Sequence, residues 1–122
     1  MGTLYINSIL ATILFDSGAS HTFISQEFAQ KHDIPFETMP SPLEITTPGS
    51  HWQTIWITPE VIISIGPVWF PTSLIALKST DIDIILGMDW LVKHKAVIDC
   101  AARSVVLTNL SGKSVLYWAP SA

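Results

Sequence analysis

The chain has 122 residues, of which 48% are apolar and only 13% are charged, and its formal net charge at pH 7 is −4. This length predicts a single domain over residues 1–122. Nucleic acid is excluded as the main partner, because phosphate binding needs clustered Lys and Arg and the six basic residues here are scattered. The low share of charge indicates apolar surface that awaits a second subunit or an extended ligand.

Cys100 is the only cysteine, so an internal disulfide is impossible and a reducing compartment fits. We expect Cys100 to be a small buried side chain. The longest apolar stretch, residues 61–77, contains Gly66, Pro67 and Pro71, and predicts strands around a turn rather than a membrane helix. No basic segment opens the chain, so we expect neither a signal peptide nor a membrane partner.

Short apolar runs bounded by turn residues predict a domain made mostly of strands. In chain order these strands cover residues 4–6, 10–15, 22–24, 43–46, 53–57, 61–65, 68–70, 73–77, 82–86, 97–98, 105–107 and 115–118. The pair 43–46 and 53–57 forms a hairpin with Thr47-Pro48-Gly49-Ser50 at its tip. Residues 35–42 are predicted to be a proline-rich connection.

Two short helices interrupt the strands. Ser25 is typical of an N-cap, followed by a short helix from Gln26 to Lys31 or His32 with Glu27 in its first turn. A second helix follows Gly87, with Asp89 near its start and basic residues near its end.

The most informative motif is the run Leu14-Phe15-Asp16-Ser17-Gly18-Ala19-Ser20, in which an apolar strand leads directly into an acid. An ionised carboxylate is costly to bury unpaired. We infer that a second, identical Asp meets Asp16 across a dimer axis, so that the two carboxylates share a proton and activate a water. The structural alternative is an ordinary Asx turn after a strand.

The sequence of this loop resembles a known catalytic motif. Asp16-Ser17-Gly18-Ala19 is similar to the catalytic loop of aspartic proteases, and Ile84-Ile85-Leu86-Gly87 is similar to their second hallmark. Together with Gly87-Met88-Asp89-Trp90-Leu91 and Val97-Ile98-Asp99-Cys100, the chain resembles the protease domain of gypsy-class LTR retrotransposon polyproteins, kin of retroviral proteases. The resemblance covers about residues 2–108 and leaves 109–122 as a C-terminal strand extension. It implies an all-β, retropepsin-like, closed β-barrel-like domain with one or two short helices.

The resemblance also implies roles for single residues. Asp16 is the catalytic acid, Ser17 hydrogen-bonds across to the partner loop, and Gly18 permits close backbone approach. Substrate binding is implied for Ala19, Ser20, Thr47, Pro48, Gly49 and Ser50, the last four as a flap that closes over the cleft. Trp52 and Trp56 line substrate pockets, support the flap or pack in the core, and the sequence leaves these readings open.

Other acids and histidines are expected to be structural. Asp89 is rejected as a second catalytic acid, because a carboxylate at a helix start is favoured by the helix dipole. Asp81, Asp83 and Asp99 are expected to serve turns and solvated faces. The four histidines lack metal-ligand spacing, so we expect neither a metal nor another cofactor.

The predicted function is therefore an aspartic endopeptidase, active as a homodimer on an extended polypeptide, which processes a retrotransposon polyprotein. We expect an intracellular, cytoplasmic location, including virus-like particles. Three alternatives stay open. The first is a catalytically silent dimerisation or peptide-binding module of the same fold. The second is a ubiquitin-directed acid protease, and the third is an excised domain that lacks dimer contacts.

Overall fold

The computed structural model describes residues 2–16, 18–47, 50–78 and 82–118. Its two helices are short, α1 (Gln26–Lys31) and α2 (Met88–Lys93). The strands are β1 (Gly2–Ile6), β2 (Ile9–Phe15), β3 (Phe23–Ser25), β4 (Glu37–Thr47), β5 (Ser50–Ile57), β6 (Val61–Ile65), β7 (Val68–Thr72), β8 (Ile75–Leu77), β9 (Ile84–Leu86), β10 (Val97–Asp99), β11 (Ser104–Thr108) and β12 (Ser114–Trp118). The predicted all-β class with two short helices is confirmed.

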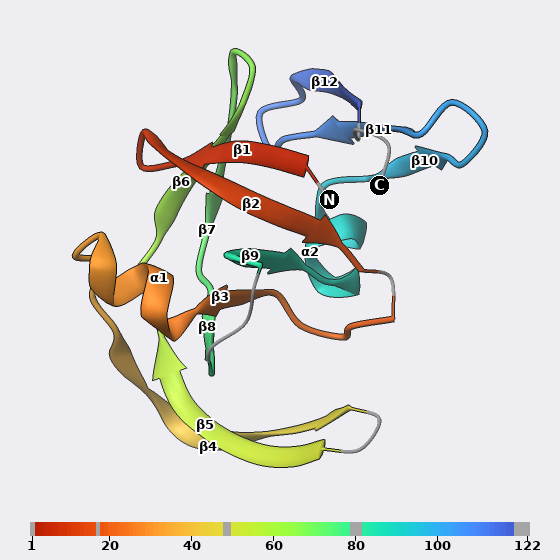
Figure 1. Cartoon of the computed structure of the whole chain (residues 1–122). Helices are drawn as coiled ribbons and strands as arrows, with labels where there is room; N and C mark the ends of the chain where they lie inside the picture. Colours follow the sequence, from red (N-terminus) through yellow and green to blue (C-terminus); the bar gives the residue numbers. More distant parts are fainter. Residues whose placement is uncertain (1, 17, 48–49, 79–81, 119–122) are drawn as a thin grey trace.

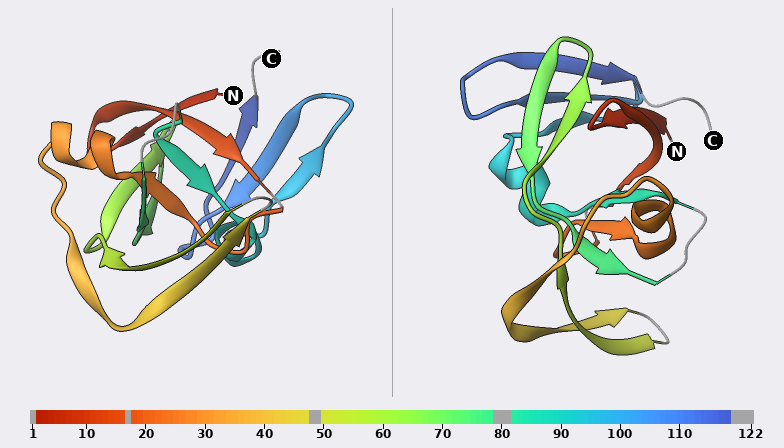
Figure 2. Two further views of the ribbon diagram at one scale, coloured as in Figure 1. Left: turned by 60° about the horizontal axis from the view of Figure 1, so that its bottom comes forward. Right: turned by 90° about the vertical axis from the view of Figure 1, so that its left-hand side faces the viewer.

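The strands form two sheets (Figures 1 and 2). The larger sheet has the order β4-β5-β8-β3-β9-β2-β1-β6-β7, and the smaller has the order β10-β11-β12. The large sheet curves around the core in the expected barrel-like manner, but it does not close, because β4 and β7 lie at its two ends and do not pair with each other. Three of its pairings, β1–β2, β4–β5 and β6–β7, are hairpins of consecutive strands, whereas β2 pairs with β9 in parallel.

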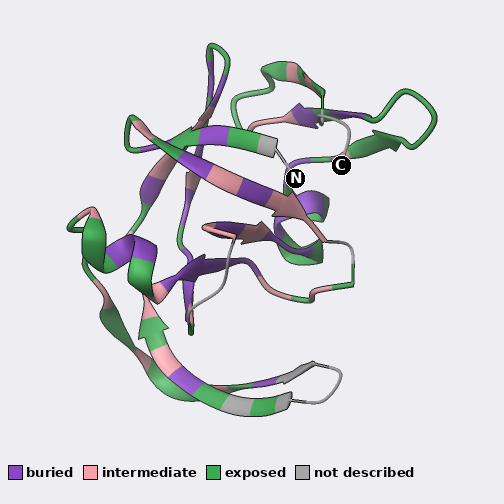
Figure 3. Ribbon diagram, viewed as in Figure 1, coloured by how far each residue is buried: buried purple, intermediate pink, exposed green. Residues whose placement is uncertain are grey.

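The apolar residues form a main core and a smaller second cluster. Strand β2 shows the pattern that builds the core: Ala11 and Ile13 are buried, while Leu10 is 56% exposed. Figure 3 shows buried positions along β3, β6 and α2, on the inner side of the fold. The second cluster has Phe23, Ile45 and Ile75 at its centre, with Ala19, Leu43, Ile57, Leu77 and Ile85 packed around them.

Both predicted helices are confirmed. The Ser25 Oγ accepts a hydrogen bond from the Phe28 backbone N at 3.3 Å, so Ser25 is the N-cap of α1. Helix α2 follows Gly87 and buries Trp90 and Leu91 against the core. None of the described helices has the length and apolar character that a membrane crossing needs. The apolar stretch 61–77 instead forms β6, β7 and β8.

Two predictions are wrong. Residues 37–42 belong to β4 rather than to a loop. Since β4 is the end strand of its sheet and its register shifts between Thr38 and Leu43, prolines there remove no hydrogen bond that the sheet needs. Cys100 is exposed rather than buried, because it follows β10, whose three residues are all exposed, at the start of a turn.

Candidate active site

Asp16 stands at the point where the buried strand β2 ends. The parallel pairing of Phe15 with Leu86 brings the ends of β2 and β9 together. The Asp16 backbone N continues this ladder by donating to the Leu86 carbonyl oxygen at 3.0 Å. The carboxylate is half-buried, so the core fixes its backbone while its side chain stays accessible.

The loop after Asp16 folds back on the carboxylate. The Gly18 backbone N donates to Asp16 Oδ1 at 2.9 Å, and the Ala19 N donates to the Asp16 carbonyl oxygen at 3.1 Å. A Cβ on Gly18 would lie 3.2 Å from Oδ1, which is tighter than ordinary contact. No described residue forms a hydrogen bond with Oδ2. The Asx-type turn is therefore present, and it orients a carboxylate that keeps one oxygen for a ligand.

The segment between β9 and α2, around Gly87, packs against the backbone of the Asp16 loop. The Met88 backbone N donates to the Ala19 carbonyl oxygen at 2.7 Å. A Cβ on Gly87 would lie 2.0 Å from the His21 carbonyl oxygen and 2.9 Å from that of Ala19. Only glycine permits this approach, which explains why an apolar strand ends in Gly87 beneath the loop.

Thr22 links the loop to the start of α2. Its buried hydroxyl accepts from the Gly87 N at 3.1 Å and donates to Asp89 Oδ1 at 2.7 Å. Asp89 Oδ1 also accepts from the Trp90 N at 2.7 Å. Asp89 thus braces the loop and the helix start, in agreement with its rejection as a second catalytic acid.

Asp83 has a more specific role than the predicted turn or solvated face. Its Oδ2 accepts from the Thr12 N at 2.8 Å, and its own N donates to Thr12 Oγ1 at 3.1 Å. Its carbonyl oxygen accepts from the Ser25 N at 2.8 Å. Asp83 therefore joins β2 and β3 just before β9 begins. By contrast, Asp99 serves a turn as expected, since its Oδ1 accepts from the Ala102 N at 3.0 Å, and Asp81 lies outside the described residues.

The β4–β5 hairpin extends toward the same side of the molecule as the Asp16 loop (Figure 1). Its backbone pairing continues to Thr47 opposite Ser50, so the hairpin is confirmed up to the predicted tip. The second apolar cluster connects the two features, because it includes Ala19 from the loop and Ile45 from the hairpin. An apolar surface thus lies between the carboxylate and the base of the hairpin.

The remaining predicted site residues fall into two groups. Ser20 is exposed, and its Oγ lies 3.2 Å from His21 Nδ1. Trp56 is 44% exposed on β5 rather than packed in the core. The predictions for Ser17, Pro48 and Gly49 lie outside the described residues, and so do those for the side chains of Thr47, Ser50 and Trp52.

The arrangement offers one accessible carboxylate and a rigid support. In the described part of the chain, no three His, Cys, Asp or Glu side chains lie close enough together to hold a metal ion. A single carboxylate can act as a general base, but peptide hydrolysis also needs an acid that protonates the leaving amine. The site of one chain therefore supplies one of the two carboxyl groups that this reaction needs.

Sequence reasoning did not identify Thr22 as a support of the loop or Asp83 as a link between β2 and β3. Their hydrogen-bond partners lie 65 to 71 residues away in the chain, so no local pattern points to them. The sequence offers one weak indication of these contacts: a threonine stands on each side of the Asp16 loop, Thr12 before it and Thr22 after it.

Two comparisons place this geometry among known proteins. A family model described as retroviral aspartyl protease matches residues 1–113. Among solved structures, the fold is similar to the retroviral protease-like domain of Ddi1 from Leishmania major. That match has a TM-score of 0.67 at 15% sequence identity and covers 93% of this chain and 91% of the other.

Proposed function

Because the chain belongs to the retroviral aspartyl protease family, we propose that it is an aspartic endopeptidase that works as a homodimer. Each subunit contributes Asp16, and the two carboxylates share one proton. The ionised Asp16 removes a proton from a water, which attacks the scissile carbonyl carbon. The protonated Asp16 donates to the carbonyl oxygen, and the amine takes a proton as the C–N bond breaks.

One observation carries this proposal. The Asp16 carboxylate stands half-exposed at the end of a buried strand, held at Oδ1 by the Gly18 N–H, with no described partner at Oδ2. Folds seldom place an unpaired acid there without a function, because core residues and sheet hydrogen bonds surround the position. The brace formed by Thr22, Gly87 and Asp89 keeps the carboxylate in one orientation.

A dimer is supported by an uncovered apolar face on the small sheet, which we call the β-face. Val97, Val106 and Leu116 are cross-strand neighbours on this face, and Trp118 lies two residues further along β12. All four side chains are exposed, Val97 by 65% and Trp118 by 60%. An exposed apolar cluster of this kind is typical of a subunit interface.

The dimer proposal is supported further by a hollow between α2 and β10, on the other side of β10 from the β-face. This hollow of about 320 Å³ is lined by Met88, Leu91, Val92, Lys95, Ala96 and Ile98. Among the described strands, β10 pairs with β11 alone, so one of its edges is open for a second chain. Figure 1 shows β10 and the Asp16 loop toward the same side of the molecule, where a two-fold axis would bring two Asp16 residues together.

The substrate in this proposal is an extended polypeptide that lies between the Asp16 loop and the β4–β5 hairpin. The partly exposed members of the second apolar cluster, which include Ala19, Leu43 and Ile85, offer contacts to apolar side chains of the peptide. By its resemblance to retrotransposon proteases, we infer that the natural substrate is the polyprotein that contains this domain.

The test compares wild type with Asp16→Asn on an unstructured protein at about pH 5, where a carboxylate pair holds one proton. We expect cleavage by wild type that rises more steeply than linearly with enzyme concentration, since only the dimer is active. Asp16→Asn keeps the shape of the side chain and removes the base, so cleavage is lost while the fold is retained.

Circular dichroism and sedimentation of both proteins serve as the control for folding and assembly. A folded, dimeric wild type that cleaves nothing at any concentration would refute the enzyme and favour a silent peptide-binding module. A rate proportional to enzyme concentration down to a monomeric protein would refute the shared site.

A further inference from the structure

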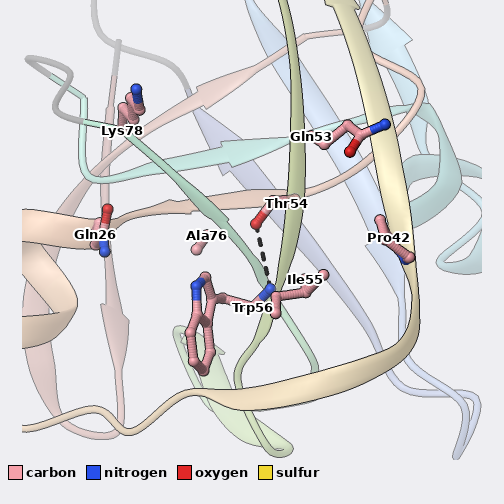
Figure 4. Close-up of a pocket in the computed structure, with 8 residues that line it drawn as sticks. All are labelled: Gln26, Pro42, Gln53, Thr54, Ile55, Trp56, Ala76 and Lys78. Carbon is pink, nitrogen blue, oxygen red and sulfur yellow. Dashed lines mark hydrogen bonds between the residues drawn. The ribbon is translucent and has the colours of Figure 1, made fainter.

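A second cavity lies away from Asp16, where the β4–β5 hairpin joins the body of the domain. It has a volume of about 370 Å³ and is lined by Gln26, Pro42, Gln53, Thr54, Ile55, Trp56, Ala76 and Lys78. We call it the hinge groove. Figure 4 shows Gln26, Ala76 and Lys78 on one side of β5 and Pro42 on the other, with Thr54 between them.

The hinge groove spans a thin connection. Strand β5 meets β8 through a single residue pair, Ile57 with Ile75. Next to it, the Thr58 N donates to the Leu74 carbonyl oxygen at 2.8 Å and the Leu74 N donates to Thr58 Oγ1 at 2.9 Å. A ligand in the groove would therefore contact the hairpin and the body at once.

On β8, the hinge groove and the proposed peptide cleft use different residues. Ile75 and Leu77 of β8 pack in the second apolar cluster, which reaches the Asp16 loop through Ala19. Ala76 and Lys78 alternate with them along the chain and line the groove. Because neighbouring residues of a strand point to opposite faces, the two surfaces lie on opposite sides of β8.

Three hydrogen-bond donors line the Lys78 side of the groove. The Lys78 ammonium, the Gln26 side-chain amide and the Trp56 indole N–H have no acceptor among the described residues. The indole nitrogen lies on the ring edge nearest Gln26 and Ala76 (Figure 4). At the other end, Gln53 Nε2 already donates to Glu44 Oε1 at 3.0 Å. The groove therefore attracts an anion at its Lys78 end and disfavours one at its Glu44 end.

The other walls are apolar and suit a flat or aliphatic body. Pro42, Ile55 and the exposed indole of Trp56 line the groove between its two polar ends. Its volume lies in the range of small-ligand sites. We propose that the hinge groove binds a carboxylate carried on a small apolar or aromatic body, with the carboxylate near Gln26 and the Trp56 N–H and with the flexible Lys78 side chain as the cation that attracts it.

Such a carboxylate could belong to an acidic residue in a polypeptide or to a free small acid. In either case the bound ligand ties the β4–β5 hairpin to β8 and α1. The site does not depend on the protein hydrolysing peptides, so the two proposals fail separately.

The experiment follows the Trp56 indole N–H and Gln26 amide signals by NMR, in an Asp16→Asn background where no peptide is cleaved. The probes are acetyl-Phe-Glu-amide, its uncharged match acetyl-Phe-Gln-amide, and free 3-phenylpropionate. Lys78→Met removes the cation but keeps the stem, and Lys113→Met is the matched control at a distant exposed lysine.

We expect the Glu peptide to shift both signals and Lys78→Met to weaken its binding at least about fivefold, as for a solvent-exposed charge-assisted hydrogen bond. Lys113→Met should leave binding unchanged. Equal binding of 3-phenylpropionate supports a free acid as the source, and binding of the Glu peptide alone supports a polypeptide. Equal binding of the Gln peptide, or no shift up to about 10 mM ligand, would overturn the proposal.

Discussion

At Gly87 the end of β9 lies in close contact with the backbone of the Asp16 loop. The missing side chain of this glycine lets the His21 and Ala19 carbonyl oxygens approach the end of β9. Both neighbouring atoms belong to backbone, so they cannot rotate away as a flexible side chain would. The orientation of Asp16 thus depends on a residue that carries no chemistry itself.

We therefore expect Gly87→Ala to displace the loop and to lower the free energy of unfolding by about 3 kcal/mol or more. Urea denaturation measures the loss. Gly112→Ala is the matched control, because its Cβ would meet no atom within 4 Å and only its φ of 85° is strained, which costs about 1 kcal/mol. Equal stability of the two variants would contradict the close approach.

A second expectation at residue scale concerns the Thr22 hydroxyl. Thr22→Val keeps the shape but leaves the Gly87 N–H and Asp89 Oδ1 each without one hydrogen bond. We expect a loss of about 2 kcal/mol in the free energy of unfolding. Thr22→Ser keeps the hydroxyl and should lose only about 1 kcal/mol through its methyl group. A larger loss in the Ser variant than in the Val variant would refute the network.

These residues also show how far the sequence predicts the site. Asp16, Gly18 and Gly87 stand in local motifs whose chemistry can be read from neighbouring residues. Thr22 and Asp83 act on partners more than 60 residues away, and such pairings depend on how the strands assemble. A threonine before a strand has many possible roles, and only the fold selects one.

At the scale of elements, predictability follows the distance between paired strands. The hairpins β1–β2, β4–β5 and β6–β7 join neighbours in the chain, and their turn residues mark them. The parallel pairing of β3 with β8 joins distant segments and has no local signal. Strand β4 was partly missed because prolines normally argue against a strand, whereas an end strand tolerates them.

The β-face gives a prediction at this scale. Leu116 is 47% exposed and lies beside Val106 on the face that we propose for the dimer. Since each substitution counts twice in a two-fold interface, Leu116→Glu should weaken the dimer at least about tenfold. Sedimentation over a concentration series measures this, and cleavage should fall in parallel.

The matched control for this experiment is Leu10→Glu, a change of the same type on an exposed position of β2. This variant should assemble as wild type does. If Leu116→Glu stays dimeric, the β-face is not the interface and the two-fold axis must pass elsewhere.

At the scale of the whole molecule, His94 connects the two sheets. It caps α2, and its carbonyl oxygen accepts from the Thr108 N of β11 at 2.8 Å. The imidazole is 1% exposed and packs against Phe70 of the large sheet and Trp90 of α2. Its Nδ1 lies 3.0 Å from the Trp90 carbonyl oxygen, which can only accept, so Nδ1 carries the proton.

The other ring nitrogen makes His94 sensitive to acid. Nε2 is buried and has no hydrogen-bond partner among the described residues. Burial lowers the pKa of His94 below its ordinary 6.5 and is the largest effect. The hydrogen bond to the Trp90 backbone raises this pKa, and the positive charge of Lys93 lowers it by a smaller amount. A proton on Nε2 would be a charged donor in an apolar site, so the folded protein resists it.

The sign of the pH dependence follows from this lowered pKa. Below about pH 6.5 the unfolded chain binds a proton at His94 that the folded chain does not bind. The stabilising contribution of neutral His94 is thus complete above this pH and is lost as the pH falls toward the pKa of the folded state. We expect the free energy of unfolding of wild type to decrease with acidification in this window more steeply than that of His94→Phe.

Urea denaturation of wild type and His94→Phe from pH 8 to pH 5 measures the difference. At pH 8 both side chains are neutral, so the gap between the two proteins there reports packing alone. Below pH 6.5 the free energy of unfolding of wild type should fall relative to that of the variant.

The same residue bears on the pH dependence of cleavage. The proposed chemistry needs one protonated Asp16, which acid favours. The junction of the two sheets needs a neutral His94, so acid also weakens the support of the β-face. The acid limb of cleavage should therefore move to lower pH in His94→Phe, and parallel stability curves for the two proteins would show that His94 does not set it.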